Sequence, residues 1–231
     1  MIGLIKNKLA KYPNVKAFLK SPWNWFYAAY LTIKYVDKWE KFPCFTIKGS
    51  CRIKISKLKG ATLEIREKLI FEQWLLGNER IVLSLSQKSN CVIQNEFTIG
   101  NGVRIFVAPE GNLLIKGREN ESGSGITANS VVMVYKSLEI GKDCIIAWDT
   151  FLTDCDWHGI KGKYSIKETI IGDHVWIGVG AKILKGSIIN SNSIVTTLSV
   201  VLAGNYEKSS MISGSPAKIV KTNIAPWSRE M

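Results

Sequence analysis

The chain has only two histidines, and one of them lies in a segment that could do acid-base chemistry. His158 ends the run Asp154-Cys-Asp-Trp-His, so that Asp156 and Asp154 precede it by two and four residues. In an extended chain these three side chains share a face, and either carboxylate could hold the imidazole in one tautomer. Asp149 competes for that role. An imidazole held in this way can act as a general base, and a solvated surface histidine is the alternative that these residues leave equally open.

Other candidate groups have weaker claims. His174, in Gly-Asp-His-Val-Trp, lies inside a regular pattern and is expected at a turn on the outer surface. Cys155 is near enough to His158 to raise a covalent mechanism, although a lone cysteine is more often passive. The five cysteines are scattered and form neither a CxxC metal pair nor a disulfide framework. The sequence therefore predicts no metal cofactor and is typical of a reducing cytoplasm.

A repeat of six residues dominates the second half of the chain. From 171 to 201 every sixth residue is aliphatic, and upstream the same spacing holds at 140, 146 and 152. The residues between them are mostly small or polar. Six is the period of neither a helix nor a simple amphipathic strand, and it fits short strands joined by tight corners, with one inward side chain per strand. Three such strands close an 18-residue coil, and the coils stack as parallel strands. A β-sandwich with coincidental spacing is the alternative.

The segment that follows Leu152 breaks this pattern. A full coil after Leu152 would place the next aliphatic residue at 170, yet the series resumes at Ile171. His158 lies in the interrupted stretch, so we expect it in a loop that leaves the coil.

Residues 1–42 differ from the rest of the chain. Eight lysines against Asp37 and Glu40 place half of the formal charge of +12 in this segment, among seven Trp, Tyr and Phe side chains between residues 23 and 39. It is expected to be helical, with a helix start at Ser21-Pro22 and a break near Pro13. The composition suits either a membrane interface or packing on the rest of the protein. No nucleic-acid-binding motif accompanies the charge.

From residue 43 onward the chain consists of short Val-, Ile- and Thr-rich runs separated by turn residues. We therefore predict an N-terminal extension over 1–42 and a repeat domain over 43–231. The longest mostly apolar run is too short to span a membrane, and the first residues do not form a standard signal peptide. We expect a cytoplasmic protein, and peripheral contact with the inner face of the membrane is one of the two open roles of residues 1–42.

The segment Ile171-Gly-Asp-His-Val-Trp-Ile-Gly-Val-Gly-Ala-Lys-Ile-Leu-Lys-Gly186 resembles the signature of hexapeptide-repeat acyltransferases. The ending Ile212-Ser-Gly-Ser-Pro-Ala-Lys-Ile-Val-Lys221 resembles the closing motif of that family. With the 154–158 segment, the likeness covers about residues 138–225 and is strongest to bacterial capsule and lipopolysaccharide O-acetyltransferases. It implies an all-β fold, a left-handed parallel β-helix. The α-helical N-terminal extension predicted above over residues 1–42 does not match the core of the family.

The resemblance also implies a function. Acetyl-CoA would be the donor, a hydroxyl of a surface glycan the acceptor, and a homotrimer the assembly. His158 would be the catalytic base, with Asp156 preferred to orient it, and Trp176 would lie beside an active site between subunits. The remaining donor contacts that it implies are Gly178 and Ala181 along the pantetheine, Thr197 where relatives often have alanine, and Lys218 and Lys221 near the phosphates.

The sequence departs from its relatives at Leu198-Ser-Val-Val-Leu-Ala203, where many have a lysine that contacts the donor. Three other functions remain open on the same scaffold. They are N-acetylation of an amino-sugar nucleotide or of another small acceptor, a non-catalytic binding module, and a membrane-associated scaffold that does not bind coenzyme A.

Overall fold

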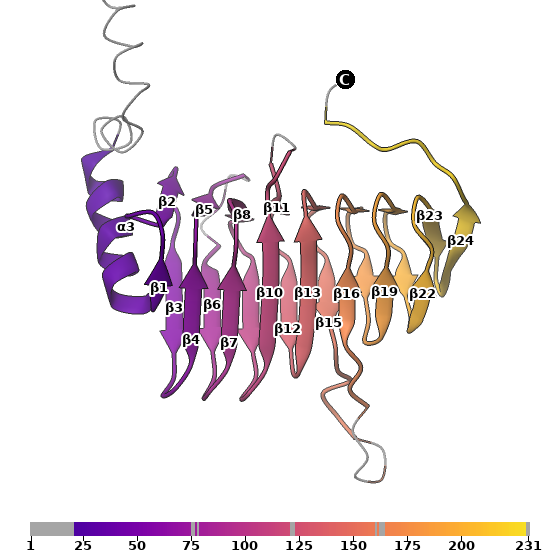
Figure 1. Ribbon diagram of the computed structural model, residues 1–231, viewed down its shortest axis with the longest axis horizontal. Helices are drawn as coiled ribbons and strands as arrows, with labels where there is room; N and C mark the ends of the chain where they lie inside the picture. The colour runs from indigo at the N-terminus through magenta and orange to yellow at the C-terminus, as the bar shows by residue number, and fades with distance from the viewer. Residues whose placement is uncertain are drawn as a thin grey trace, which may run out of the picture.

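The computed structural model describes residues 21–74, 77, 79–120, 123–159, 161 and 165–229. Within these ranges the chain forms one helix, α3 (Pro22–Tyr35), followed by strands that coil around a common axis. The strands make three sheets, which form the three walls of a long prism, and α3 covers its N-terminal end (Figure 1).

Each wall receives one strand from each coil. Sheet A contains β1 (Lys38–Trp39), β4 (Thr62–Ile65), β7 (Asn90–Ile93), β10 (Asn112–Gly117), β13 (Ser137–Lys142), β16 (Thr169–Ile171), β19 (Ser187–Ile189) and β22 (Gly204–Tyr206). Sheet B contains β2 (Phe45–Lys48), β5 (Leu69–Glu72), β8 (Phe97–Gly100), β11 (Gly125–Ile126), β14 (Ile145–Ile146), β17 (Trp176–Ile177), β20 (Ile194–Val195), β23 (Met211–Gly214) and β24 (Ala217–Lys221). Sheet C contains β3 (Ile53–Lys57), β6 (Ile81–Leu85), β9 (Arg104–Val107), β12 (Val131–Val134), β15 (Phe151–Thr153), β18 (Lys182–Ile183) and β21 (Val200–Val201).

The strand pairs are parallel except for β23 and β24, which are antiparallel and end the coil. In Figure 1 the chain rises through the front strands of sheet A, crosses the top through sheet B and descends at the back through sheet C. Because the coils advance from left to right as it does so, the β-helix is left-handed, as the resemblance implied.

The six-residue series forms the core. All nine aliphatic side chains of the series, at 140, 146, 152, 171, 177, 183, 189, 195 and 201, are fully buried. The strand register stacks them in columns, for example Ile140 on Ile171 and Ile171 on Ile189. Each coil therefore buries its aliphatic residues against those of the next, which is how stability accumulates in a repeat fold. The predicted three-walled coil is confirmed.

The N-terminal half continues the same three walls, although its sequence shows the six-residue spacing only loosely. Apart from the two-residue β1, its strands up to β10 are four to six residues long, and Phe45, Phe71 and Phe97 occupy core positions that smaller side chains fill later. The core at this end of the prism is therefore partly aromatic, whereas the later coils bury aliphatic side chains.

The expected helix start at Ser21-Pro22 is confirmed, because Ser21 is the N-cap residue and Pro22 follows it. Pro13 lies outside the described residues. The first strand, β1 (Lys38–Trp39), already pairs with β4 in sheet A, so the β-helix begins inside the segment 1–42 that we expected to be a separate extension.

Helix α3 has one face on the protein and one face in solvent. Ala28, Leu31 and Thr32 are buried against the first coil, where the Thr32 hydroxyl lies 3.5 Å from the Cys44 thiol. The opposite face exposes large apolar side chains, with 84% of Trp23 and 69% of Ile33 accessible to solvent. No helix in the described ranges has the length and hydropathy required to cross a bilayer.

Candidate active site

The interruption in the six-residue series is a loop between β15 and β16. It leaves the corner between sheets C and A and projects below the lower edge of the prism in Figure 1. A bridge between Cys155 and Ile166 closes its base, and the Lys167 N–H donates to the Asp154 carbonyl at 3.0 Å. The expected loop around His158 is therefore present, with its two ends held together.

Asp154 supports this loop from within the protein. Its carboxylate is fully buried and accepts the backbone N–H groups of Tyr135, Lys136 and Ser137 at 2.6, 2.6 and 2.7 Å. These three charge-assisted hydrogen bonds use three of the roughly four acceptor sites of a carboxylate. Asp154 thus fixes the preceding corner and is not the partner of His158.

Trp157 anchors the outer part of the loop. Its indole N–H donates to the Thr153 hydroxyl at 3.0 Å, and its ring lies 5.6 Å from Phe106 and 5.7 Å from Tyr135, measured between centroids. His158 follows directly and is exposed. Sequence reasoning assigned no role to Trp157, although an indole in a polar loop was a signal that the loop packs on a wall of the prism.

Asp156 forms an ion pair with Lys185 from the next coil. Among the described residues no hydrogen bond or ion pair involves the His158 side chain, so the orienting role of Asp156 stays a prediction. Asp149 is exposed at a turn with φ of 60°, one corner away.

Four of the five cysteines are buried, and the partly exposed Cys51 lies in the first coil, far from the loop of His158. Cys155 is buried, and its sulfur accepts a hydrogen bond from the backbone N–H of Trp157 at 3.2 Å. Burial raises the pKa of the Cys91 and Cys144 thiols to about 12, so both are neutral at physiological pH. In the described part of the chain, no three His, Cys, Asp or Glu side chains gather as metal ligands would.

Most of the predicted donor contacts gather elsewhere, on sheet B and at its corner with sheet C in the last coils. Trp176 is 42% exposed on the outer face of β17. Thr197 is exposed in the turn after β20, and its backbone N would lie 2.6 Å from a Cβ at Gly178. The stacking of neighbouring coils therefore already requires glycine at position 178.

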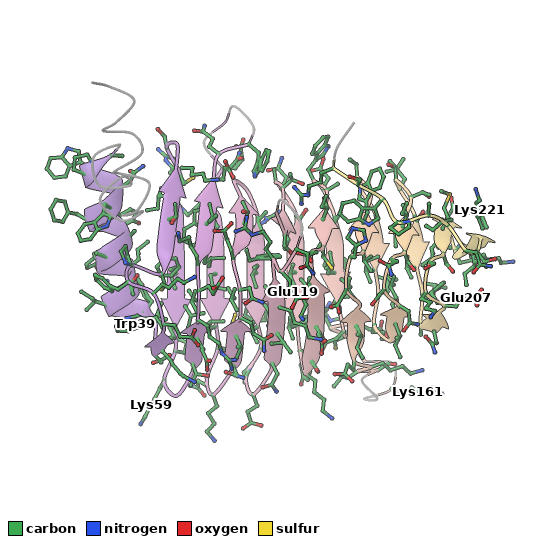
Figure 2. All side chains as sticks on the ribbon, turned by 45° about the horizontal axis from the view of Figure 1, so that its top comes forward. Trp39, Lys59, Glu119, Lys161, Glu207 and Lys221 are labelled. Atoms are coloured by element: carbon green, nitrogen blue, oxygen red, sulfur yellow. The ribbon has the colours of Figure 1, made fainter. Side chains whose placement is uncertain are left out.

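The two predicted lysines lie at the C-terminal end of the same region. Both are exposed on β24, with Lys218 opposite Ser213 and Lys221 opposite Met211. The Thr196 hydroxyl donates to the Ser213 hydroxyl at 2.7 Å, which joins β23, the partner strand of β24, to the turn of Thr197. Figure 2 shows Lys221 at the end of the prism, well away from Lys161 of the loop.

One predicted contact needs correction. Ala181 is fully buried within the hydrophobic core. Its methyl group faces the axis of the coil and cannot line a groove on the outer surface. Its small size is explained by the tight corner that it fills between β17 and β18.

His174 occupies a corner with φ of 54°, as expected, and its Nδ1 lies 3.1 Å from the Asn192 Oδ1. The C-terminal tail returns over it. Trp227 stacks on the imidazole at 4.2 Å, donates its indole N–H to the His174 carbonyl at 3.0 Å, and lies 6.2 Å from Trp176. Sequence reasoning missed this second indole beside Trp176, because nothing in the repeat indicates where a tail folds back.

The structure does not bring the two halves of the predicted site together within one chain. The loop of His158 leaves the corner between sheets C and A, whereas Trp176 lies on sheet B, the wall opposite that corner. Because the hydrophobic core lies between them, the loop of His158 and Trp176 of the same chain cannot come into contact.

Comparison with known proteins identifies related chains. A polysialic acid O-acetyltransferase of Escherichia coli O1:K1 is 35% identical over 130 residues, and one of Neisseria meningitidis is 34% identical over 163 residues. The resemblance to bacterial O-acetyltransferases is confirmed. No protein-family model matches the chain. Among solved structures, the polysialic acid O-acetyltransferase OatWY is 26% identical with a TM-score of 0.49, and the match covers 84% of this chain and 92% of that one.

The two sequence matches cover 54% and 67% of this chain, but 41% and 62% of the relatives. The chain therefore spans about half the length of the curated relatives that it matches.

Proposed function

We propose that this chain is an acetyl-CoA-dependent O-acetyltransferase that acts on a hydroxyl of a bacterial surface polysaccharide or of its lipid-linked precursor. The observation that carries the proposal is the anchored loop that presents an exposed imidazole at residue 158. Relatives named as polysialic acid O-acetyltransferases support the reaction and the class of acceptor.

The proposed reaction is a direct transfer. Nε2 or Nδ1 of His158 removes the proton of the sugar hydroxyl while the hydroxyl oxygen attacks the carbonyl carbon of the thioester. The carbon-sulfur bond then breaks, and the coenzyme A sulfur takes the proton from the imidazolium. Asp156 would orient the ring in this scheme. Because Cys155 is buried, the scheme contains no acyl-enzyme.

Acetyl-CoA, the donor, is proposed to lie on sheet B, the wall opposite the loop of His158. Trp176 and Thr197 border the surface beside Gly178, and Lys218 and Lys221 supply the positive charge that suits the phosphates of acetyl-CoA. Since His158 and Trp176 are on opposite sides of one prism, a complete site needs a second copy of the chain. A homotrimer, in which each seam joins the loop of one copy to sheet B of the next, satisfies this need.

The proposal is tested by measuring release of coenzyme A from acetyl-CoA with a panel of acceptors. The panel contains polysialic acid, other capsular glycans, an O-antigen and an amino-sugar nucleotide. We expect turnover with at least one polysaccharide, and ester-linked acetate on that product by NMR. Turnover with the amino-sugar nucleotide alone would assign N-acetylation, and absence of turnover with every acceptor would refute the transferase.

The exposed face of α3 is proposed to touch the membrane. Trp23, Phe26, Tyr30 and Ile33 lie on this face, and residues 1–20 add five lysines that attract anionic lipid. Such contact would place the enzyme peripherally, where lipid-linked glycans are made.

We expect the Trp23→Ala, Phe26→Ala double variant to lose most of its co-sedimentation with vesicles that contain phosphatidylglycerol. Tyr135→Ala removes a 39% exposed ring far from α3 and serves as the control, with unchanged partitioning. Equal partitioning of the double variant and the wild type would rule out this contact.

A further inference from the structure

A hollow of about 240 Å³ lies on the outer face of sheet B, in the N-terminal half of the prism. It opens because Gly125 interrupts a row of outward side chains. The strand register places Gly125 between Thr98 and Ile145, and Ile70 precedes Thr98 in the same row. A side chain at position 125 would collide with the Thr98 carbonyl oxygen, which lies 2.4 Å from the point that its Cβ would occupy. The hollow is therefore built into the backbone.

An indole forms one wall of the hollow. Trp74 is 51% exposed, yet its backbone N–H donates to the Asn101 side chain at 3.0 Å, and Asn101 is itself buried. Gly100 has no Cβ, and this allows the edge of the Trp74 ring to approach the strand closely. A large ring that is held by the backbone and remains half exposed offers an apolar platform at little entropic cost.

The charged side chains that line the hollow sum to no net charge. Lys48 and Arg229 face Glu72 and Glu96 around the hollow, and Lys48 lies 3.3 Å from Glu72. Arg229 comes from the C-terminal tail and donates to the Gly123 carbonyl at 2.8 Å. A site without net charge does not favour a polyphosphate. It suits a ligand with many hydroxyl groups, which donate to carboxylates and accept from cations, and with an apolar face for the indole.

The hollow adjoins the proposed active site. Ile145 separates Gly125 from Trp176 in the same row, so the distance is two strand spacings, or about 10 Å. Its volume is below the roughly 300–1,000 Å³ of pockets that enclose a whole ligand, so it suits part of a longer chain. We infer that this hollow binds a sugar unit of the acceptor glycan, close to the unit that is acetylated. The inference rests on the proposed function.

Binding is measured with the full chain by calorimetry in the absence of acetyl-CoA, with a sialic acid tetramer and with maltotetraose as probes. We expect at least one of them to bind the wild type, and Trp74→Ala to raise its Kd by about tenfold, because a truncated aromatic anchor is a typical hot spot. Trp39→Ala removes a second, 39% exposed indole outside the hollow and should leave the Kd unchanged. Thr98→Arg, which fills the hollow, should weaken binding as Trp74→Ala does.

The inference is overturned when neither saccharide binds, or when Trp74→Ala and Thr98→Arg both bind as the wild type does. This result is separate from a failure of the proposed function. A chain that binds the saccharide through Trp74 but transfers no acetyl group would retain the hollow as a glycan site and lose the assignment of the reaction.

Discussion

Replacement of His158 by alanine is expected to lower the rate of acetyl transfer by about 10²–10⁴-fold, the range that a positioned general base contributes. The imidazole is the proposed acceptor of the hydroxyl proton, and without it the alcohol must attack the thioester unassisted. Initial rates of coenzyme A release, at saturating acetyl-CoA and a fixed glycan concentration, measure the effect.

The variant should keep its fold, because His158 is exposed and has no hydrogen-bond partner among the described residues. Equal melting temperatures of variant and wild type establish this. His174→Ala is the matched control, since that imidazole is stacked under Trp227 and has no proposed part in proton transfer. A His158→Ala enzyme with near-normal turnover would remove the base from the mechanism.

Asp154→Ala is expected to lower the free energy of unfolding by about 3–5 kcal/mol. The buried carboxylate accepts three backbone N–H groups from residues 135–137, and each hydrogen bond to a charged group contributes about 1.5–3 kcal/mol. Contributions within one network do not add, so the expected loss is smaller than their sum. Alanine would leave these donors buried without an acceptor. Denaturant titration followed by circular dichroism measures the loss.

Asp156→Ala is the comparison for this effect. It removes a carboxylate two residues away that is half exposed and paired with Lys185, and surface ion pairs contribute about 0–1 kcal/mol. Asp154→Ala and Asp156→Ala should therefore differ clearly in stability. Similar losses in both variants would contradict the structural role that we assign to Asp154.

Local patterns in the sequence predicted several elements accurately. The predicted three-walled coil is present, and so is the predicted loop after Leu152. Strand β3 (Ile53–Lys57) alternates apolar and polar residues, whereas β5 (Leu69–Glu72) begins with three consecutive buried apolar residues, so no single strand pattern covers the N-terminal half.

For the candidate site, the sequence could identify residues but not their neighbours. Asp154 and Asp156 are equivalent in a linear pattern, and only the coil places one under the turn at 135–137 and the other beside Lys185. Ala181 and Gly178 are both small residues in one segment, yet one faces the core and the other a neighbouring coil. Such differences depend on which way each side chain points at a corner.

The sequence alone determined that the chain coils with a period of six, because burial of one aliphatic side chain per strand leaves a regular trace in the residue order. It also determined that His158 lies in a loop, since an interrupted period is equally visible. Tertiary structure decided that the loop and Trp176 lie on opposite sides of the prism, and that Trp227 and Arg229 return to sheet B. These contacts join residues distant in sequence, and their geometry follows from the stacking of whole coils, which no local pattern encodes.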